Sequence, residues 1–265
     1  MPKFSIFILI FVVIFSFFGS FLYTIDAYTL DSASILLPPS LEHFLGTDRL
    51  GRDILARLME GGKVSLIIGV GSAFIASVIG LVLGSMAGYF RGSVDKGFIV
   101  LVDLFLTFPT FFLLLALVSY VNASAWVLIV IISITGWMTT ARLVRSESFK
   151  ITSQPYIKIL NIANVSKLKI LFKYYAPILA PIYFVSFTFG VGGAILAESG
   201  LSFLGLGIVA PQMSWGTILS AGKEVIEIAW WVSFFPGLMI FLVTFSLINI
   251  SNYLQQLTNQ KQIQN

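Results

Sequence analysis

Long apolar stretches that carry almost no charge set the main limit on the structure of this chain. A helix needs about 20 predominantly apolar residues to cross a bilayer. Five stretches meet this requirement and one of them is long enough for two helices, so the sequence predicts an all-α membrane protein with six transmembrane helices. The predicted spans are Phe4–Leu22, Val64–Phe90, two helices within Gly97–Ala141 that separate near residues 121–124, Tyr174–Ala197 and Ile228–Ile250.

The composition excludes several other classes of protein. Hydrophobic residues make up 57% of the 265 residues and charged residues only 11%, whereas soluble domains carry roughly 25% charged residues. A soluble enzyme, a disordered chain and a nucleic-acid binder are therefore excluded. The chain has no cysteine, which excludes a disulfide framework and a cysteine-based metal site. The sequence predicts no bound cofactor or metal and no catalytic residue.

The distribution of basic residues predicts the orientation. With the N-terminus inside, eleven of the 16 basic residues fall in cytoplasmic segments, so the positive-inside rule favours both termini in the cytoplasm. The first span also fits a signal peptide, because Lys3 precedes an apolar core. The residues after it, Gly19–Tyr23, offer no clear small-x-small cleavage site, which favours a retained anchor.

The cytoplasmic loop, residues 142–173, holds seven of those eleven basic residues. After Pro155, an apolar stripe of Tyr156, Ile159, Leu160 and Ala163 follows helical spacing. A short amphipathic helix of this kind lies on a membrane or docks in a partner's groove, and the loop alone does not decide between the two.

Intramembrane carboxylates and prolines mark candidate pathway or gate residues. Asp103 lies in the third predicted helix and Pro109 follows it. A carboxylate in a membrane is costly and usually faces a cavity or a partner, and proline permits a kink. The alternative is that Asp103 reaches the inner interface and pairs with Lys96 or with a basic residue of the loop. Glu198, at the start of an outer loop, is a further candidate.

Small residues in the second helix predict close helix packing. Ala76, Gly80, Gly84 and Gly88 recur every four residues and form a smooth ridge along which backbones approach closely. Packing inside the bundle is the favoured interpretation, and contact with a second membrane subunit is compatible with it.

The first outer loop contains the run Gly46-Thr47-Asp48-Arg49-Leu50-Gly51-Arg52-Asp53. Thr47 or Asp48 is predicted to cap a helix that lies at the outer interface before the second span. Charge pairs at i, i+4 spacing support such a helix; they are Asp48–Arg52, Arg49–Asp53 and Asp53–Arg57. The second outer loop is apolar and rich in glycine, and is expected to re-enter the bilayer or to close over a cavity.

These motifs together resemble the inner-membrane permease subunits of ABC importers of the dipeptide, oligopeptide and nickel class, and in particular their "C" permease. The first matching motif contains Gly46, Thr47, Asp48, Gly51, Arg52 and Asp53, and the second contains Glu198, Gly205, Gly207 and Trp215. The resemblance implies a type I importer permease fold in the inner membrane. It also implies a homologous second permease subunit, two ATPase subunits that bind ATP and Mg²⁺, an extracytoplasmic solute-binding protein and contact with membrane lipid.

Such permeases carry a cytoplasmic coupling loop that begins Glu-Ala-Ala and docks on the ATPase. Here Lys158-Ile159-Leu160 stands at that position, Asn164 at a later glycine and Pro177 at a later proline. Lysine for glutamate reverses a charge, whereas asparagine is the best substitute for glycine where a left-handed residue is needed. The residues that the resemblance assigns to ATPase coupling are Tyr156, Lys158, Ile159, Leu160, Ala163 and Asn164.

The sequence therefore predicts three regions and one leading function. Residues 1–63 form an anchor helix and an outer loop, residues 64–254 a permease core with its coupling loop, and residues 255–265 a cytoplasmic tail. The leading function is the permease subunit of an ATP-driven importer that works by alternating access. The alternatives are an ATP-independent transporter or channel of six helices and a membrane partner that has lost transport. The substrate stays open between peptides, nickel and a related small solute.

Overall fold

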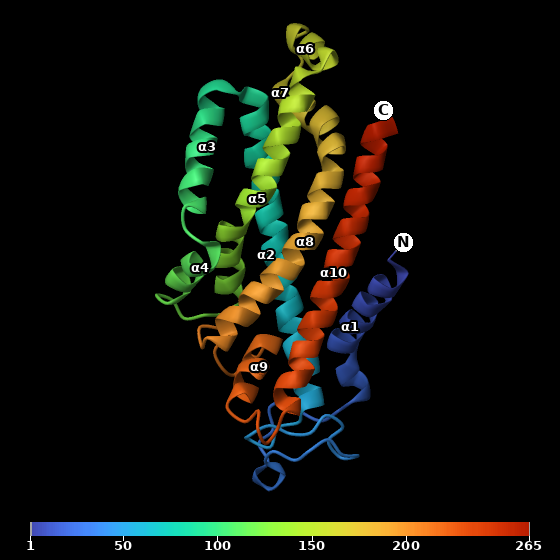
Figure 1. Ribbon diagram of the computed structural model, residues 1–265, viewed down its shortest axis with the longest axis vertical. Helices are drawn as coiled ribbons and strands as arrows, with labels where there is room; N and C mark the ends of the chain where they lie inside the picture. Colours follow the sequence, from blue (N-terminus) through green and yellow to red (C-terminus); the bar gives the residue numbers. More distant parts are fainter. Residues whose placement is uncertain (1, 265) are drawn as a thin grey trace.

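A computed structural model describes residues 2–264 of the chain, although for residues 259–264 it describes only the backbone. The described chain is a bundle of long helices with loops gathered at one end (Figure 1). We call the end formed by residues 23–53 and 204–230 the loop end, and the opposite end, formed by residues 154–175, the α6 end. The longest helices run between the two ends. The helices are α1 (Lys3–Leu22), α2 (Ile54–Phe90), α3 (Gly92–Leu106), α4 (Thr110–Val118), α5 (Ala125–Ser153), α6 (Pro155–Ile162), α7 (Lys167–Ile170), α8 (Ala176–Phe203), α9 (Trp215–Lys223) and α10 (Trp231–Gln264).

Five helices in the described residues are long and apolar enough to cross a membrane. The bent pair α3 and α4 forms a sixth span if it is counted as one. The all-α fold and the predicted number of spans are therefore confirmed. The two helices of the pair meet at 76°, at the break next to Pro109, because proline does not continue the hydrogen-bond ladder of α3.

The small-residue ridge of α2 packs against α5, and this pair forms the most extensive helix contact in the bundle. A Cβ placed on Gly80 would lie 2.8 Å from Cβ of Thr140, and one placed on Gly84 would lie 3.0 Å from Cβ of Val144. Only a hydrogen atom fits at such positions, so the glycines bring the two backbones together. The ridge therefore packs within the bundle, as the favoured interpretation expected.

The anchor helix is part of the bundle. α1 packs against α2 and α10, and its Val12 and Ser16 are buried. A Cβ on Gly62 of α2 would collide with Ser16. The first predicted span therefore packs closely within the bundle.

Three predicted boundaries are wrong. The expected separate helix at the outer interface is absent from the described loop, because residues 46–53 are irregular and Asp53, rather than Thr47 or Asp48, caps a helix that continues into the second span. The fourth span, predicted to end at Ala141, continues to Ser153, which moves the first third of the predicted coupling loop into α5. The last helix extends far beyond Ile250 and takes up residues 255–264 of the predicted tail.

Candidate functional site

The short helix α6 projects beyond the other helices at its end of the bundle (Figure 1). Pro155 starts the helix, where its missing N–H costs nothing. Ile157 is 0% exposed and packs into a cluster with Val144 and Ile151 of α5 and with Tyr175. A fully buried isoleucine stabilises such a contact by roughly 1.5–3 kcal/mol, so α6 is attached to the bundle through one apolar anchor.

Hydrogen bonds extend this attachment to three long helices. The Tyr89 hydroxyl of α2 donates to Oδ1 of Asn161 at 2.8 Å, and the rings of Tyr89 and Tyr175 meet edge to face at 5.6 Å. Tyr175 lies in the turn that leads into α8, and its hydroxyl is 2.6 Å from Oγ1 of Thr152 on α5. The Tyr89–Asn161 bond therefore links α6 to α2, and the contacts of Tyr175 with Tyr89 and Thr152 extend this connection to α5 and to the start of α8.

Asn164 ends α6 in the conformation that the sequence predicted. Its φ is +54°, in the left-handed region that asparagine adopts more readily than other non-glycine residues. Two backbone bonds close the helix around it, from the N–H of Asn164 to Asn161 O at 3.1 Å and from the N–H of Val165 to Leu160 O at 3.1 Å. Asparagine thus fills the position at which the family resemblance places glycine.

The other predicted coupling residues are mostly exposed, but they do not form one buried stripe. Tyr156, Lys158, Ile159 and Ala163 are exposed, with Ile159 at 64%, whereas Leu160 is half-buried beside the Ile157 cluster. The stripe prediction missed Ile157, because the apolar residues of α6 face two directions and spacing alone does not say which face meets the bundle. Ile162 adds to the exposed face.

Asp103 lies on α3 and forms an ion pair with α5. Its side chain is 58% exposed and accepts a hydrogen bond from Nη2 of Arg142 at 2.5 Å. The alternative, a partner among the basic residues of the predicted loop, is confirmed, although Arg142 lies on α5 and Lys96 is not the partner. Pro109 marks the break between α3 and α4 and is exposed.

A second ion pair links α3 to α5 and was not predicted. Asp95 accepts hydrogen bonds from Nε and Nη2 of Arg145. The guanidinium groups of Arg145 and Arg91 both lie 4.9 Å from the ring of Phe149. These residues hold the first turn of α3 against α5. The sequence did not predict the Asp95–Arg145 pair because the two residues lie 50 positions apart.

The loop end is organised around Asp48. Its carboxylate accepts hydrogen bonds from the N–H groups of Leu50 and Arg52 at 2.8 and 3.0 Å, and it pairs with the guanidinium groups of Arg52 and Arg57 at 2.7 and 3.5 Å. The predicted Asp48–Arg52 pair is confirmed. The predicted Arg49–Asp53 and Asp53–Arg57 pairs are wrong, because Arg49 reaches Glu224.

Asp53 joins the start of α2 to the rest of the loop. One carboxylate oxygen caps α2 at the N–H of Ala56, and the other lies 2.8 Å from the Tyr23 hydroxyl and 2.9 Å from Nδ1 of His43. Burial and the hydrogen bond to Asp53 raise the pKa of Tyr23 well above its usual range. The only histidine of the chain is therefore used to fix a loop.

Two of the motif glycines are required by the turns of this loop. Gly46 and Gly51 have φ of +77° and +73°, which residues with a Cβ adopt only at a cost. A Cβ on Gly46 would also lie 2.6 Å from Nε1 of Trp231, and that nitrogen donates to Thr47 O at 3.1 Å. The first motif therefore forms a compact, hydrogen-bonded loop that packs against Trp231 at the start of α10.

Glu198 is a fully buried carboxylate within α8. It is 0% exposed and accepts hydrogen bonds from four serine hydroxyls, which we call the Glu198 cluster. Ser214 and Ser202 donate at 2.6 and 2.7 Å, and Ser65 and Ser199 at 3.4 and 3.5 Å. Among the described residues, Glu198 forms no ion pair with a basic side chain. The cluster ties α2, α8 and the N-terminus of α9 together.

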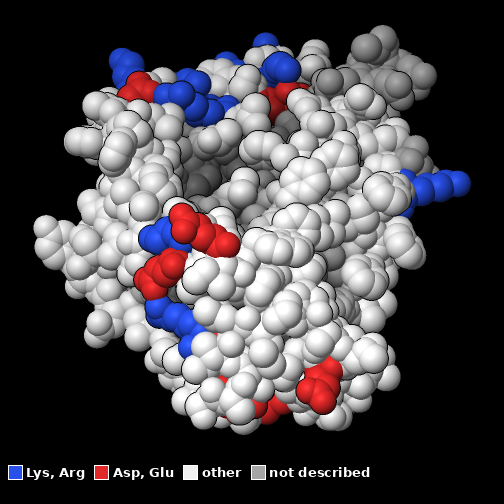
Figure 2. All heavy atoms as spheres, turned by 60° about the horizontal axis from the view of Figure 1, so that its bottom comes forward, with Lys and Arg blue, Asp and Glu red and all other residues white. Residues whose placement is uncertain are grey.

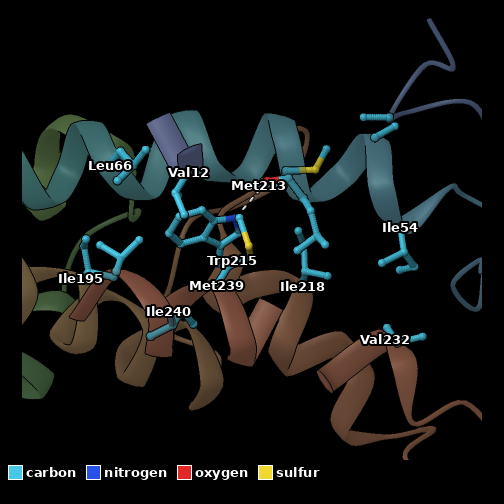
Figure 3. Packing of buried hydrophobic residues seen from close by; sticks show 14 of the residues in the cluster. Val12, Ile54, Leu66, Ile195, Met213, Trp215, Ile218, Val232, Met239 and Ile240 are labelled. Carbon is cyan, nitrogen blue, oxygen red and sulfur yellow. Dashed lines mark hydrogen bonds between the residues drawn. The ribbon is translucent and has the colours of Figure 1, made fainter. Parts of the chain in front are cut away.

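Trp215 fills the space beside this cluster (Figure 3). Its indole packs among Val12 of α1, Leu66 of α2, Ile195 of α8 and Met239 of α10, and Nε1 donates to Leu58 O at 2.9 Å. The second motif therefore holds four long helices together at the loop end. Gly207 packs closely against Ser202, while Gly205 turns the chain at φ +81°, and a Cβ added there would meet no atom within 4 Å.

The surface of the loop end is mostly uncharged. Figure 2, turned to bring this end forward, shows a white face with a hollow and with acidic and basic side chains touching in one group. No set of three metal-ligating side chains occurs in the described residues.

Comparison with known proteins identifies relatives over most of the chain. A family model described as "Binding-protein-dependent transport system inner membrane component" matches residues 80–262. The oligopeptide transport system permease protein OppC of Haemophilus influenzae is 32% identical over 96% of this chain and 81% of its own length. The dipeptide permease DppC of Bacillus subtilis is 32% identical over 97% and 81%, and the nickel permease NikC of Escherichia coli K12 is 32% identical over 84% and 81%.

A solved structure shares the fold. A chain of the MetNI methionine ABC transporter superimposes with a TM-score of 0.58 at 17% identity, covering 75% of this chain and 96% of that chain.

Proposed function

The chain belongs to the family of binding-protein-dependent transport system inner membrane components, and on that premise we propose that it is the permease subunit of an ATP-driven importer. Three relatives at 32% identity are named as permeases for oligopeptides, dipeptides and nickel. We propose the same substrate range, small peptides or nickel or a related small solute. The protein is a multi-pass component of the inner membrane.

The observation that carries the proposal is the construction of α6. One face of this helix is anchored in the bundle by Ile157, and the opposite face, with Ile159 and Ile162, is exposed. An exposed apolar face on a helix that projects from the bundle is expected at a docking site. We propose that the ATPase covers this face and that the α6 end lies in the cytoplasm.

The anchoring contacts supply a path for coupling. When ATP binding brings the two ATPase subunits together, each moves the helix that it holds. In this chain the movement reaches α2 through Tyr89, α5 through Thr152 and α8 through Tyr175. We propose that these helices alternate between inward and outward access. ATP and Mg²⁺ are bound by the ATPases, and the chain itself contributes no nucleotide site.

The remaining partners follow from the same proposal. A homologous permease subunit completes the membrane pathway, a second ATPase subunit docks on that partner, and an extracytoplasmic binding protein delivers the solute to the loop end. The shape of that end is fixed by the hydrogen-bonded loop around Asp48 and by the Glu198 cluster. A binding protein can dock on this fixed surface.

The test is reconstitution of the complex that copurifies with this chain into liposomes. The probes are a radiolabelled dipeptide, a radiolabelled oligopeptide and radioactive nickel ion, each offered with its binding protein. ATP on the side that holds the ATPases is expected to drive uptake of one probe. The Ile159→Asp variant is expected to lose the attached ATPase and therefore uptake. The control variant Ile226→Asp, at an exposed isoleucine of the loop end, is expected to keep the ATPase attached.

Uptake without ATP by the chain alone would contradict the proposal and identify a secondary transporter or channel. ATP hydrolysis by an intact complex that moves none of the probes, with any binding protein, would favour a transport-inactive membrane partner.

A further inference from the structure

The α6 end and the part of α5 that leads to it carry basic side chains of two kinds. Three of them are paired within the chain: Arg142 with Asp103, Arg145 with Asp95 and Lys150 with Glu147. Three others are exposed, and their side chains make no ion pair or hydrogen bond with a described residue; they are Lys158, Lys169 and Lys173. The Lys167 ammonium group lies 5.1 Å from the centre of the Phe90 ring.

The unpaired lysines lie next to exposed apolar side chains. Lys158 is flanked on α6 by Tyr156 and Ile159, and the α7 lysines flank Leu168, which is 68% exposed. Helices α6 and α7 contact each other, so these residues form one surface. This surface has exposed apolar side chains at its centre. The lysines beside them have no acidic partner among the described residues.

The direction of this surface favours a protein partner over the bilayer. Ile157 points into the bundle, and Ile159, two residues later, is rotated by about 200° around the helix axis. The exposed face of α6 therefore points away from the membrane-spanning helices, at the end where α6 projects furthest (Figure 1).

We propose that the ATPase groove that receives α6 is apolar at its centre and lined with carboxylates opposite Lys158 and the α7 lysines. This inference rests on the proposed function and adds the chemistry of the partner. Complementary charge favours encounter and register, whereas a basic groove opposite Lys158 would place like charges together and suppress binding. Lys158 stands where the family resemblance places a glutamate. The groove of this ATPase is therefore expected to carry the opposite charge to a groove that receives a glutamate.

The first experiment measures ATPase retention by the tagged chain in detergent at increasing salt. Lys158→Glu is expected to raise the apparent Kd for the ATPase by about tenfold or more, and Lys158→Met by less. Lys223→Glu, which makes the same charge change at the loop end, is the matched control and is expected to leave retention unchanged. Size-exclusion profiles of each permease variant separate lost docking from lost folding.

The second experiment identifies the partner atoms. A carbodiimide joins a lysine amine to a carboxylate in direct contact, and mass spectrometry of the intact complex is expected to find Lys158 linked to an aspartate or glutamate of the ATPase. Normal retention by Lys158→Glu together with no such link would overturn the inference and leave the proposed function standing. The inference would also be overturned if these lysines were needed for binding to phosphatidylglycerol vesicles but not for binding to the ATPase. Failure of any ATPase to copurify with the unaltered chain would overturn both.

Discussion

The two ends of the molecule treat their polar and apolar groups in opposite ways. At the loop end, Asp48, Asp53 and Glu198 are buried and find their hydrogen-bond partners within the chain. At the α6 end, Lys158 and Ile159 are exposed, and the described residues offer Lys158 no partner. A buried polar group is costly unless it is satisfied, so the loop end is complete as it stands. We propose that the α6 end gains its missing contacts from the ATPase.

The difference implies that substitutions at the loop end act on stability, and that substitutions on the outer face of α6 act on assembly. Four predictions about substitutions test that comparison, and they follow in order of decreasing expected effect.

Glu198→Ala is expected to destabilise the protein by about 4 kcal/mol, because the hydroxyls of Ser202 and Ser214 lose a charged or strongly polar acceptor in a buried site. Glu198→Gln keeps one acceptor oxygen in nearly the same place and is expected to cost less than half as much. The measurement is loss of monodisperse protein after heating in detergent. Equal thermal stability of Glu198→Ala and the unaltered protein would show that the Glu198 cluster does not stabilise the fold.

Ile157→Ala is expected to weaken the attachment of α6 to the bundle by about 3 kcal/mol, as buried isoleucine truncations do. The readout is the rate of tryptic cleavage after Lys158, Lys167 and Lys169, which should rise. Ile159→Ala removes the same atoms from the exposed face and serves as the control. If both variants are cleaved at the same rate, Ile157 is not the anchor.

Gly46→Ala is expected to cost about 2 kcal/mol, from a positive φ and from the collision with Trp231. Gly205→Ala provides a matched comparison, since its φ of +81° is similar but a Cβ there meets no atom within 4 Å. We expect only the conformational part, about 1 kcal/mol, at Gly205. The same heating assay in detergent measures both. A larger loss at Gly205 would show that the Trp231 contact contributes nothing.

Arg142→Ala is expected to change stability by less than about 1 kcal/mol, because both partners of the Asp103–Arg142 pair are more than half exposed. Thermal unfolding of the variant measures this. A large loss would mean that Asp103 is buried in the membrane environment, and would revive its interpretation as a pathway residue.

The sequence predicted the spans well because uncharged length is a direct physical requirement of the bilayer. It predicted the left-handed Asn164 and the packing role of the α2 glycines for the same kind of reason, since each depends on local geometry. It misplaced the end of α5, because Arg142, Arg145 and Lys150 indicated a loop although the helix continues through them.

The partners of the charged residues were less predictable. Asp95 and Arg145, or Glu198 and Ser65, meet only because helices far apart in the sequence pack together. Sequence spacing therefore predicted i, i+4 pairs within one loop, of which only Asp48–Arg52 formed. The same limit explains why Ile157 was missed, because its burial depends on Tyr89, Val144 and Tyr175.

The most direct test of the comparison between the two ends is hydrogen–deuterium exchange of the purified chain with and without its ATPase. Binding of the ATPase is expected to slow exchange of the backbone amides in residues 155–165. Exchange in residues 56–58 and 198–206 should be slow in both samples, because their backbone N–H groups are hydrogen-bonded within the chain. Unchanged exchange at residues 155–165, or new protection confined to the loop end, would contradict the proposed roles of the two ends.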